Sequence, residues 1–113
     1  MAEQYMSVGG SSASTTIPTI IFIASANSVN IINAINLSNT SSSSSAIVEV
    51  IWSDVSEGDE FPIIKNVELP YGSSLQVLDG PIILDGDAYS YDNLYIRSNS
   101  LDVTVIISLL KIT

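Results

Sequence analysis

The sequence contains no cysteine and no histidine, and only three of its 113 residues are basic. Disulfides, thiol catalysis, zinc sites built from cysteine and histidine, and histidine acid–base chemistry are therefore excluded. Lys65, Arg97 and Lys111 are too few to neutralise a run of phosphates, which argues against a nucleic-acid-binding surface. We therefore expect a protein that is not an enzyme and that needs no cofactor or metal ion.

Charge of either sign is scarce, while apolar residues are plentiful. Charged residues make up 13% of the chain, against roughly 25% in an average globular domain. Hydrophobic residues make up 46%, and the formal net charge is -9. The most apolar runs, at residues 17–26 and 101–112, are much shorter than the roughly 20 residues that span a bilayer. Residues 1–6 are acidic and lack the positive charge of a secretory signal, so we expect no membrane segment.

Short apolar runs alternate with turn residues along most of the chain, a pattern typical of an antiparallel β-sandwich. The runs are rich in Ile, Val, Thr, Ser and Asn, which are mediocre helix formers. We predict strands at residues 15–24, 29–37, 47–55, 61–69, 74–78, 82–84, 88–97 and 101–112. The expected fold is an all-β, antiparallel β-sandwich of seven to eight strands, with jelly-roll or another Greek-key connectivity.

Alternation of apolar and polar residues assigns the faces of three of these runs. The predicted inward face of residues 29–37 consists of Val29, Ile31, Ile35 and Leu37. The inward face of residues 47–55 consists of Val48, Val50 and Trp52. The inward face of residues 101–112 consists of Leu101, Val103, Val105, Ile107 and Leu109.

The start of the chain differs from the rest in composition. Residues 1–14 are small and polar around Gly9 and Gly10, so we predict a flexible N-terminal arm there. Residues 15–113 are then one β-sandwich domain, a length that can bury a core without metal or disulfide support. Within it, the Ser/Thr run at residues 40–45 is predicted to be an exposed connection.

The acidic turn Asp85-Gly86-Asp87, with Asp79 before it and Asp92 after it, is a candidate calcium site. Closely spaced oxygen ligands around a glycine turn are what Ca²⁺ requires. The spacing does not match an EF-hand loop, however. Asp and Gly also tolerate the dihedral angles of a hairpin turn, so we interpret the segment as a tight turn without a metal.

Tyr89, Tyr91 and Tyr95 occupy alternate positions of one predicted strand, so they would line one of its faces. A row of exposed aromatic rings could stack on sugars, as in carbohydrate-binding modules. Packing in a core or an interface explains the same pattern, because aromatic rings bury large areas. These three tyrosines are our candidate contact residues for a glycan or a partner.

Several isoleucines lie near or opposite the faces assigned to the core, and a monomer would have difficulty in covering them all. They are Ile20, Ile32, Ile51, Ile64, Ile83 and Ile106. Lysine, which commonly protects exposed strand edges, is also scarce here. We therefore expect part of the surface to be covered by identical copies or by a larger assembly.

Residues 67–79 read VELPYGSSLQVLD, in which an apolar run leads to Pro-x-Gly-Ser-Ser and a short strand ending near Asp. In this segment the second half of the chain resembles small β-sandwich structural proteins of tailed bacteriophages, where the same succession occurs. The likeness continues through residues 82–84, the Gly86-Asp87 turn, residues 94–96 and residues 101–105. In the first half, residues 36–40 (NLSNT) are similar to the strand-to-loop segment of those proteins. The family's more usual basic residue in the following strands is represented only by Lys65.

This resemblance implies a β-sandwich subunit of a virion, placed on the head, neck or tail, and it implies no catalytic residues. The leading hypothesis is a capsid decoration or cement protein, or a neck or tail subunit, that forms homo-oligomers and binds other virion proteins through many weak contacts. The alternative is a carbohydrate-binding module of a tail that contacts a receptor.

Overall fold

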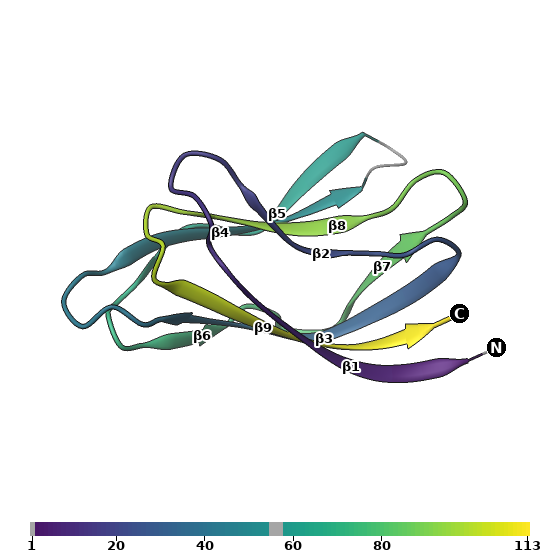
Figure 1. Ribbon diagram of the computed structural model, residues 1–113, viewed down its shortest axis with the longest axis horizontal. Helices are drawn as coiled ribbons and strands as arrows, with labels where there is room; N and C mark the ends of the chain where they lie inside the picture. The colour runs from purple at the N-terminus through teal and green to yellow at the C-terminus, as the bar shows by residue number, and fades with distance from the viewer. Residues whose placement is uncertain (1, 55–57) are drawn as a thin grey trace.

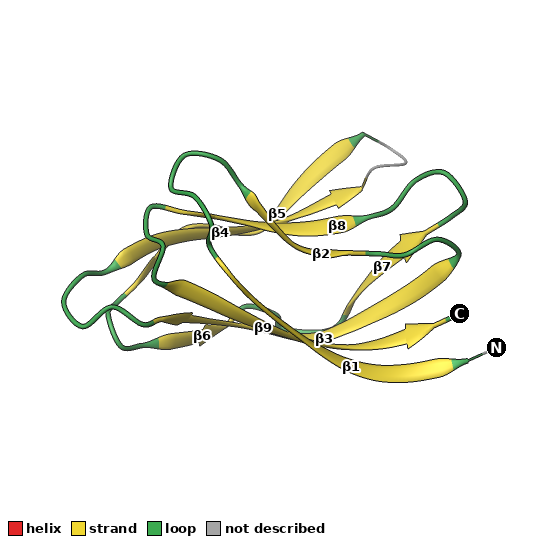
Figure 2. Cartoon of the chain, in the orientation of Figure 1, coloured by secondary structure: helices red, strands yellow, loops and turns green. Residues whose placement is uncertain are grey.

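The computed structural model describes residues 2–54 and 58–113, and every regular element in that part of the chain is a β-strand (Figures 1 and 2). Nine strands are present there: β1 (Glu3–Ser11), β2 (Thr19–Ile23), β3 (Ser28–Asn39), β4 (Ala46–Asp54), β5 (Asp59–Leu69), β6 (Ser74–Gln76), β7 (Ile82–Gly86), β8 (Asn93–Ser98) and β9 (Val103–Ile112). No helix in the described residues is long and apolar enough to cross a membrane. The predicted all-β class is confirmed, but the described residues contain one strand more than the predicted seven to eight, because residues 3–11 form β1.

The strands form two antiparallel sheets that face each other, visible as the lower and upper layers of Figure 1. Sheet A has the order β1-β9-β3, followed by β6 and β7, which both pair with the remaining edge of β3. β7 pairs with the first half of β3 and β6 with the second half, so the two short strands share one position in the sheet. Sheet B has the order β2-β8-β4-β5.

The pairing is nested around the β4–β5 hairpin. β4 pairs with β5, β3 with β6 and β7, β2 with β8, and β1 with β9. A single long hairpin that is folded across two sheets produces this nesting, which is jelly-roll connectivity. Of the two connectivities expected from the sequence, the strand order therefore selects the jelly roll.

The hydrophobic core lies between the sheets and takes alternate residues from their inner faces. Val48 and Val50 of β4 are fully buried there, and Trp52 packs against the same cluster with its ring centroid 5.3 Å from that of Phe61. In β9 the buried residues are Val103, Val105, Ile107 and Leu109. The inward faces predicted for these two strands are confirmed, except that Leu101 lies in the exposed turn before β9. Full burial of one such side chain contributes about 1.5–3 kcal/mol.

The prediction for residues 29–37 is wrong in its first half, because β3 contains a bulge. The register of β3 with β9 shifts between Ile32 and Ala34, leaving Asn33 as an extra residue. Such an insertion reverses the faces on its two sides. Ile32 is consequently fully buried, whereas Val29 is exposed and Ile31 only half-buried. Beyond the bulge, Ile35 and Leu37 face the core as predicted.

Residues 3–11 are not the flexible arm that composition suggested. They form β1, which pairs with β9 in nine consecutive register positions. Met6 and Val8 pack against the core from this strand, while most of its other residues are exposed. A Cβ on Gly10 would lie at an ordinary contact distance of 3.5 Å from Val105 Cγ1, so the pairing leaves room for a side chain there.

Two further boundaries differ from the prediction. Asp85 and Gly86 belong to β7, so the turn comes later, at residues 87–90, and β8 begins at Asn93 rather than at residue 88. The predicted loop at residues 40–45 is confirmed. Val55 at the end of one predicted strand, and residues 56–57 of the following turn, lie outside the described residues.

Candidate interaction surface

The outer face of sheet A carries a row of apolar side chains that crosses four strands. The register places Tyr5 of β1 beside Leu110 of β9, Leu110 beside Ile31 of β3, and Ile31 beside Ile83 of β7. Tyr5 is 80% exposed and Ile83 58% exposed, while Leu110 and Ile31 are half-buried between them. Neighbouring residues in such a row are close enough to contact one another.

A second row on the same face extends this surface. Ile112 of β9 lies opposite Val29 of β3, with Glu3 and Asp85 at the two ends of the row. The six apolar residues of these two rows form what we name the apolar band: Tyr5, Val29, Ile31, Ile83, Leu110 and Ile112.

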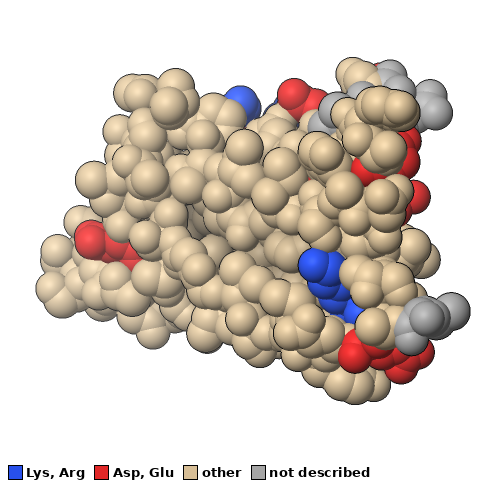
Figure 3. Space-filling model, turned by 45° about the vertical axis from the view of Figure 1, so that its right-hand side comes forward, with Lys and Arg blue, Asp and Glu red and all other residues tan. Residues whose placement is uncertain are grey.

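The rest of this face is uncharged. Its outward positions hold Ser, Thr, Asn, Gln, Ala and Gly, together with Ile106, which is 56% exposed. None of the outward positions of sheet A is Lys or Arg, and Lys111 alternates onto the opposite side of β9. Most of the surface in Figure 3, which shows the side of the molecule rather than this face, is likewise uncharged. A contiguous band of exposed apolar side chains on a sheet face is typical of a surface that another protein covers.

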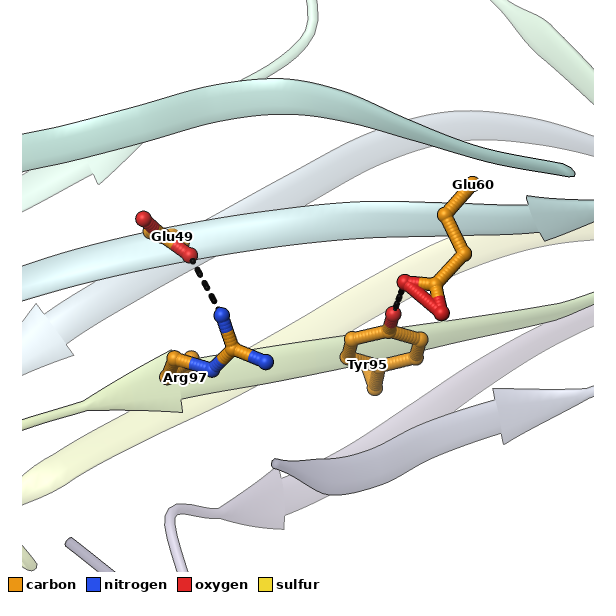
Figure 4. A network of polar contacts seen from close by, with 4 residues as sticks. All are labelled: Glu49, Glu60, Tyr95 and Arg97. Carbon is orange, nitrogen blue, oxygen red and sulfur yellow. Dashed lines mark hydrogen bonds and ion pairs between the residues drawn. The ribbon is translucent and has the colours of Figure 1, made fainter. Parts of the chain in front are cut away.

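The outer face of sheet B is different, because it carries a polar network (Figure 4). Glu49 of β4 and Arg97 of β8 are register partners, and Arg97 Nη1 lies 3.4 Å from Glu49 Oε2. The Tyr95 hydroxyl donates a hydrogen bond to Glu60 of β5. Lys65 lines the same shallow hollow as Glu49 and Arg97. Because Arg97 is half-exposed, its ion pair contributes little, at most about 1 kcal/mol.

The isoleucines expected to lie outside the core have different positions. Ile20, Ile83 and Ile106 are exposed as expected. Ile32 is a core residue and Ile64 packs against the core, so the expectation is wrong for both. Ile51 does lie on the outer face of sheet B, but it is buried there, opposite Tyr95. The sequence did not reveal most of the apolar band, because the bulge in β3 and the pairing of β1 determine its position.

The three candidate tyrosines do not form one row. Tyr89 is 95% exposed in the turn at residues 87–90, and Tyr91 is half-buried where it forms an isolated bridge with Gly86. Only Tyr95 lies in β8, where it is buried. A common strand face for all three is therefore wrong, and their contact with a glycan or partner stays a prediction.

The acidic segment forms a turn that its own backbone stabilises. The Asp87 carboxylate accepts hydrogen bonds of 2.7 Å from the backbone N–H groups of Tyr89 and Ser90, and these bonds lower the pKa of Asp87. Asp92 is buried, and its Oδ2 accepts a 3.1 Å hydrogen bond from the Asp85 N–H. Loss of hydration raises the pKa of Asp92 to about 6, although that hydrogen bond opposes the change.

A hollow of about 240 Å³ lies beside this turn, lined by Asn27, Ser28, Val29, Asp85, Gly86, Asp87, Ser90 and Asp92. Across residues 2–54 and 58–113, no three acidic side chains converge to hold a metal ion. These residues therefore give no support to a calcium site. The carboxylates of Asp87 and Asp92 accept hydrogen bonds from backbone N–H groups.

No protein-family model and no curated protein matches this sequence. Among solved structures, a chain in the structure of infectious bursal disease virus, Gt strain, is similar, with a TM-score of 0.44 and 9% sequence identity. The match covers 97% of the present chain and 33% of the viral one, so the protein spans about a third of the length of that chain.

Proposed function

We propose that this chain is a non-enzymatic structural subunit of a tailed-phage virion, either a capsid decoration or cement protein or a neck or tail subunit. The observation that carries the proposal is the apolar band on the cation-free outer face of sheet A. A rigid jelly roll with one such face is suited to lie flat against a neighbouring protein. Binding removes the apolar side chains from water, and many copies on one lattice increase the effective affinity.

The virion part of the proposal rests on the phage resemblance of two segments, residues 36–40 and 67–79, which contact each other in the fold. Asn39, at the end of the first segment, donates a side-chain hydrogen bond of 3.0 Å to the carbonyl of Leu69 in the second. The Asn39 carbonyl accepts from the Gly72 N–H, and the Asn39 N–H donates to the Ser73 carbonyl, both at 2.9 Å. The two segments thus form one structural unit where the chain crosses from β5 to β6.

The first test asks whether the protein is part of a particle. Virions are purified by density gradient from the source of this sequence, and the chain is located by mass spectrometry and immunogold electron microscopy. We expect it in the particle fraction, with gold on the head, neck or tail. If the chain occurs only among unassembled proteins, the virion assignment is wrong.

A matched pair of variants then tests the docking face. Ile83→Lys places a charge in the apolar band, and Ile20→Lys places the same charge on the outer face of sheet B. The two positions are 58% and 59% exposed, so neither change disturbs the core. On particles lacking the protein, we expect Ile83→Lys to reduce bound copies at least tenfold and Ile20→Lys to bind like wild type. Equal binding of both variants would contradict the assignment of the face.

The second candidate function is contact with a carbohydrate receptor through Tyr89, Tyr91 and Tyr95. The observation in its favour is the fully exposed ring of Tyr89 next to a hollow lined by Asp85 and Asp87. Aromatic stacking and carboxylate acceptors together suit a sugar. A glycan array with wild type, Tyr89→Ala and the control Tyr71→Ala tests it. Saturable binding that only Tyr89→Ala abolishes would support this candidate, and absence of binding by wild type would reject it.

A further inference from the structure

The two sheets have four edge positions, and three of them are protected against pairing with another strand. β5 contains Pro62 and Lys65 and two register irregularities, and β2 has only five residues, a bulge and Pro18 just before it. The position shared by β6 and β7 is divided between strands of three and five residues. Short strands, prolines, lysines and bulges are the usual protections of sheet edges.

β1 has none of these protections. It is nine residues long, keeps an unbroken register with β9, contains no proline or basic residue, and has Glu3 as its sole charge. An edge strand of this kind presents free N–H and C=O groups to any strand that can align with it.

The alternation of hydrogen-bonded and non-hydrogen-bonded pairs along the β1–β9 ladder identifies these free groups. Ala2 and Thr113 exchange two hydrogen bonds of 2.9 Å, and the Ser12 N–H donates to the Val103 carbonyl. Hydrogen-bonded pairs alternate along an antiparallel ladder, so the even-numbered residues of β1 bond to β9. The odd-numbered residues direct their N–H and C=O groups to the free edge: Glu3, Tyr5, Ser7, Gly9 and Ser11.

We propose that β1 pairs antiparallel with β1 of a second copy of this chain, about a twofold axis at Ser7. Odd residues must pair with odd residues, because only these have free backbone groups. The axis at Ser7 is the register that overlaps all of β1, placing Tyr5 opposite Gly9 of the second copy and Glu3 opposite Ser11. The joined sheet A is then continuous through both copies, with a closed, isologous contact.

The side chains on the outer face are complementary in this register. Gly9 has no side chain, and its partner on β9, Ile106, is left 56% exposed. Tyr5, itself 80% exposed, would cover Gly9 and reach Ile106 of the second copy. One contact therefore accounts for an exposed tyrosine, an exposed isoleucine and a glycine on the same face.

The inner face and the charges are also compatible with pairing. Met6 lies opposite Val8 of the second copy, so half-buried apolar residues meet each other. The two Glu3 carboxylates lie at opposite ends of the interface, ~27 Å apart for eight residues of strand, so they do not repel. This inference does not depend on the virion assignment, since the pairing concerns the isolated chain.

Sedimentation velocity of the purified chain, from low to high micromolar concentration, tests the pairing. Ser7→Lys places two like charges directly opposite each other at the axis, whereas the control Ser74→Lys adds the same charge at the far edge of sheet A. We expect a dimer for wild type and Ser74→Lys, and at least a tenfold weaker association for Ser7→Lys. Monomeric wild type throughout this range, or undiminished association of Ser7→Lys, would overturn the proposal.

The register is tested separately by spin labels. The chain has no native cysteine, so Ser11→Cys introduces a single nitroxide site in each copy. The axis at Ser7 predicts ~27 Å between the two labelled backbone positions, whereas the registers one pair shorter or longer predict ~20 Å or ~34 Å. A distance near either of the last two values, or no measurable dipolar coupling, would overturn the proposed contact.

Discussion

Asp92 is expected to make the stability of the fold depend on pH in an unusual direction. Its carboxyl group is buried beside the residue 87–90 turn, and desolvation raises its pKa from the ordinary 3.8 to about 6. The charges of Asp85 and Asp54 contribute to this increase in pKa, and the hydrogen bond from the Asp85 N–H opposes it. The folded protein therefore holds this proton more tightly than the unfolded chain does.

The sign of the effect follows from linkage. A carboxyl group with a raised pKa in the folded state stabilises the fold below about pH 4, and this contribution is lost as the pH rises through about 6. A shift of about two pH units corresponds to at most about 3 kcal/mol at 1.36 kcal/mol per unit. Most carboxyl groups in folded proteins act in the opposite direction, since their pKa values are lowered.

The substitution Asp92→Asn removes the titration and keeps an oxygen that can accept the Asp85 N–H. The measurement is the free energy of unfolding in urea, for both proteins, at several pH values between about 4 and 8. We expect the variant to gain stability relative to wild type as the pH rises, by up to about 3 kcal/mol. Asp102→Asn, in the exposed turn before β9, controls for the loss of one negative charge. A difference between wild type and Asp92→Asn that is independent of pH would refute the reasoning.

Two further substitutions test the packing. Ile107→Ala, in the core, is expected to lower the free energy of unfolding by about 2–5 kcal/mol because it leaves a cavity. Ile106→Ala, at the exposed neighbouring position, should change it by less than about 0.5 kcal/mol. Similar losses for both variants in urea denaturation would contradict the face assignment of β9. Gly86→Ala would direct a Cβ into the carbonyl oxygen of Ser25 and to 3.1 Å from Cδ1 of Tyr91. We therefore expect the free energy of unfolding to fall by about 1–3 kcal/mol. An unchanged melting temperature would show that the loop containing Ser25 moves aside without cost.

The sequence predicted the strands whose side-chain alternation is intact. β4 and β9 each pair with strands on both sides, and the extra residues of their irregular ladders lie on their partners β3 and β5. Their apolar residues therefore keep a period of two, and that period identifies the inner face from the residues alone. Gly58 and Gly72 lie between the predicted strands, and both have positive φ angles, 73° and 68°.

The apolar band could be predicted only in part from side-chain alternation. Ile83 and Ile106 were identified as apolar residues outside the core, because each lies in a run whose neighbours fill the inward positions. Tyr5 and Ile31 were missed. Tyr5 belongs to a strand too poor in apolar residues to be distinguished from a polar arm, and Ile31 was assigned to the wrong face by the bulge at Asn33.

By itself, then, the sequence determined the all-β class, the exclusion of histidine and cysteine chemistry, and the inner faces of the regular strands, since each follows from composition or from a local period. The tertiary structure alone decided the jelly-roll order, the bulge in β3, and the pairing of β1 with β9. These depend on backbone hydrogen bonds between segments that are distant in the sequence, such as Ala2 with Thr113. Main-chain groups are the same for nearly every residue type, so the sequence pattern of one strand does not name its partner.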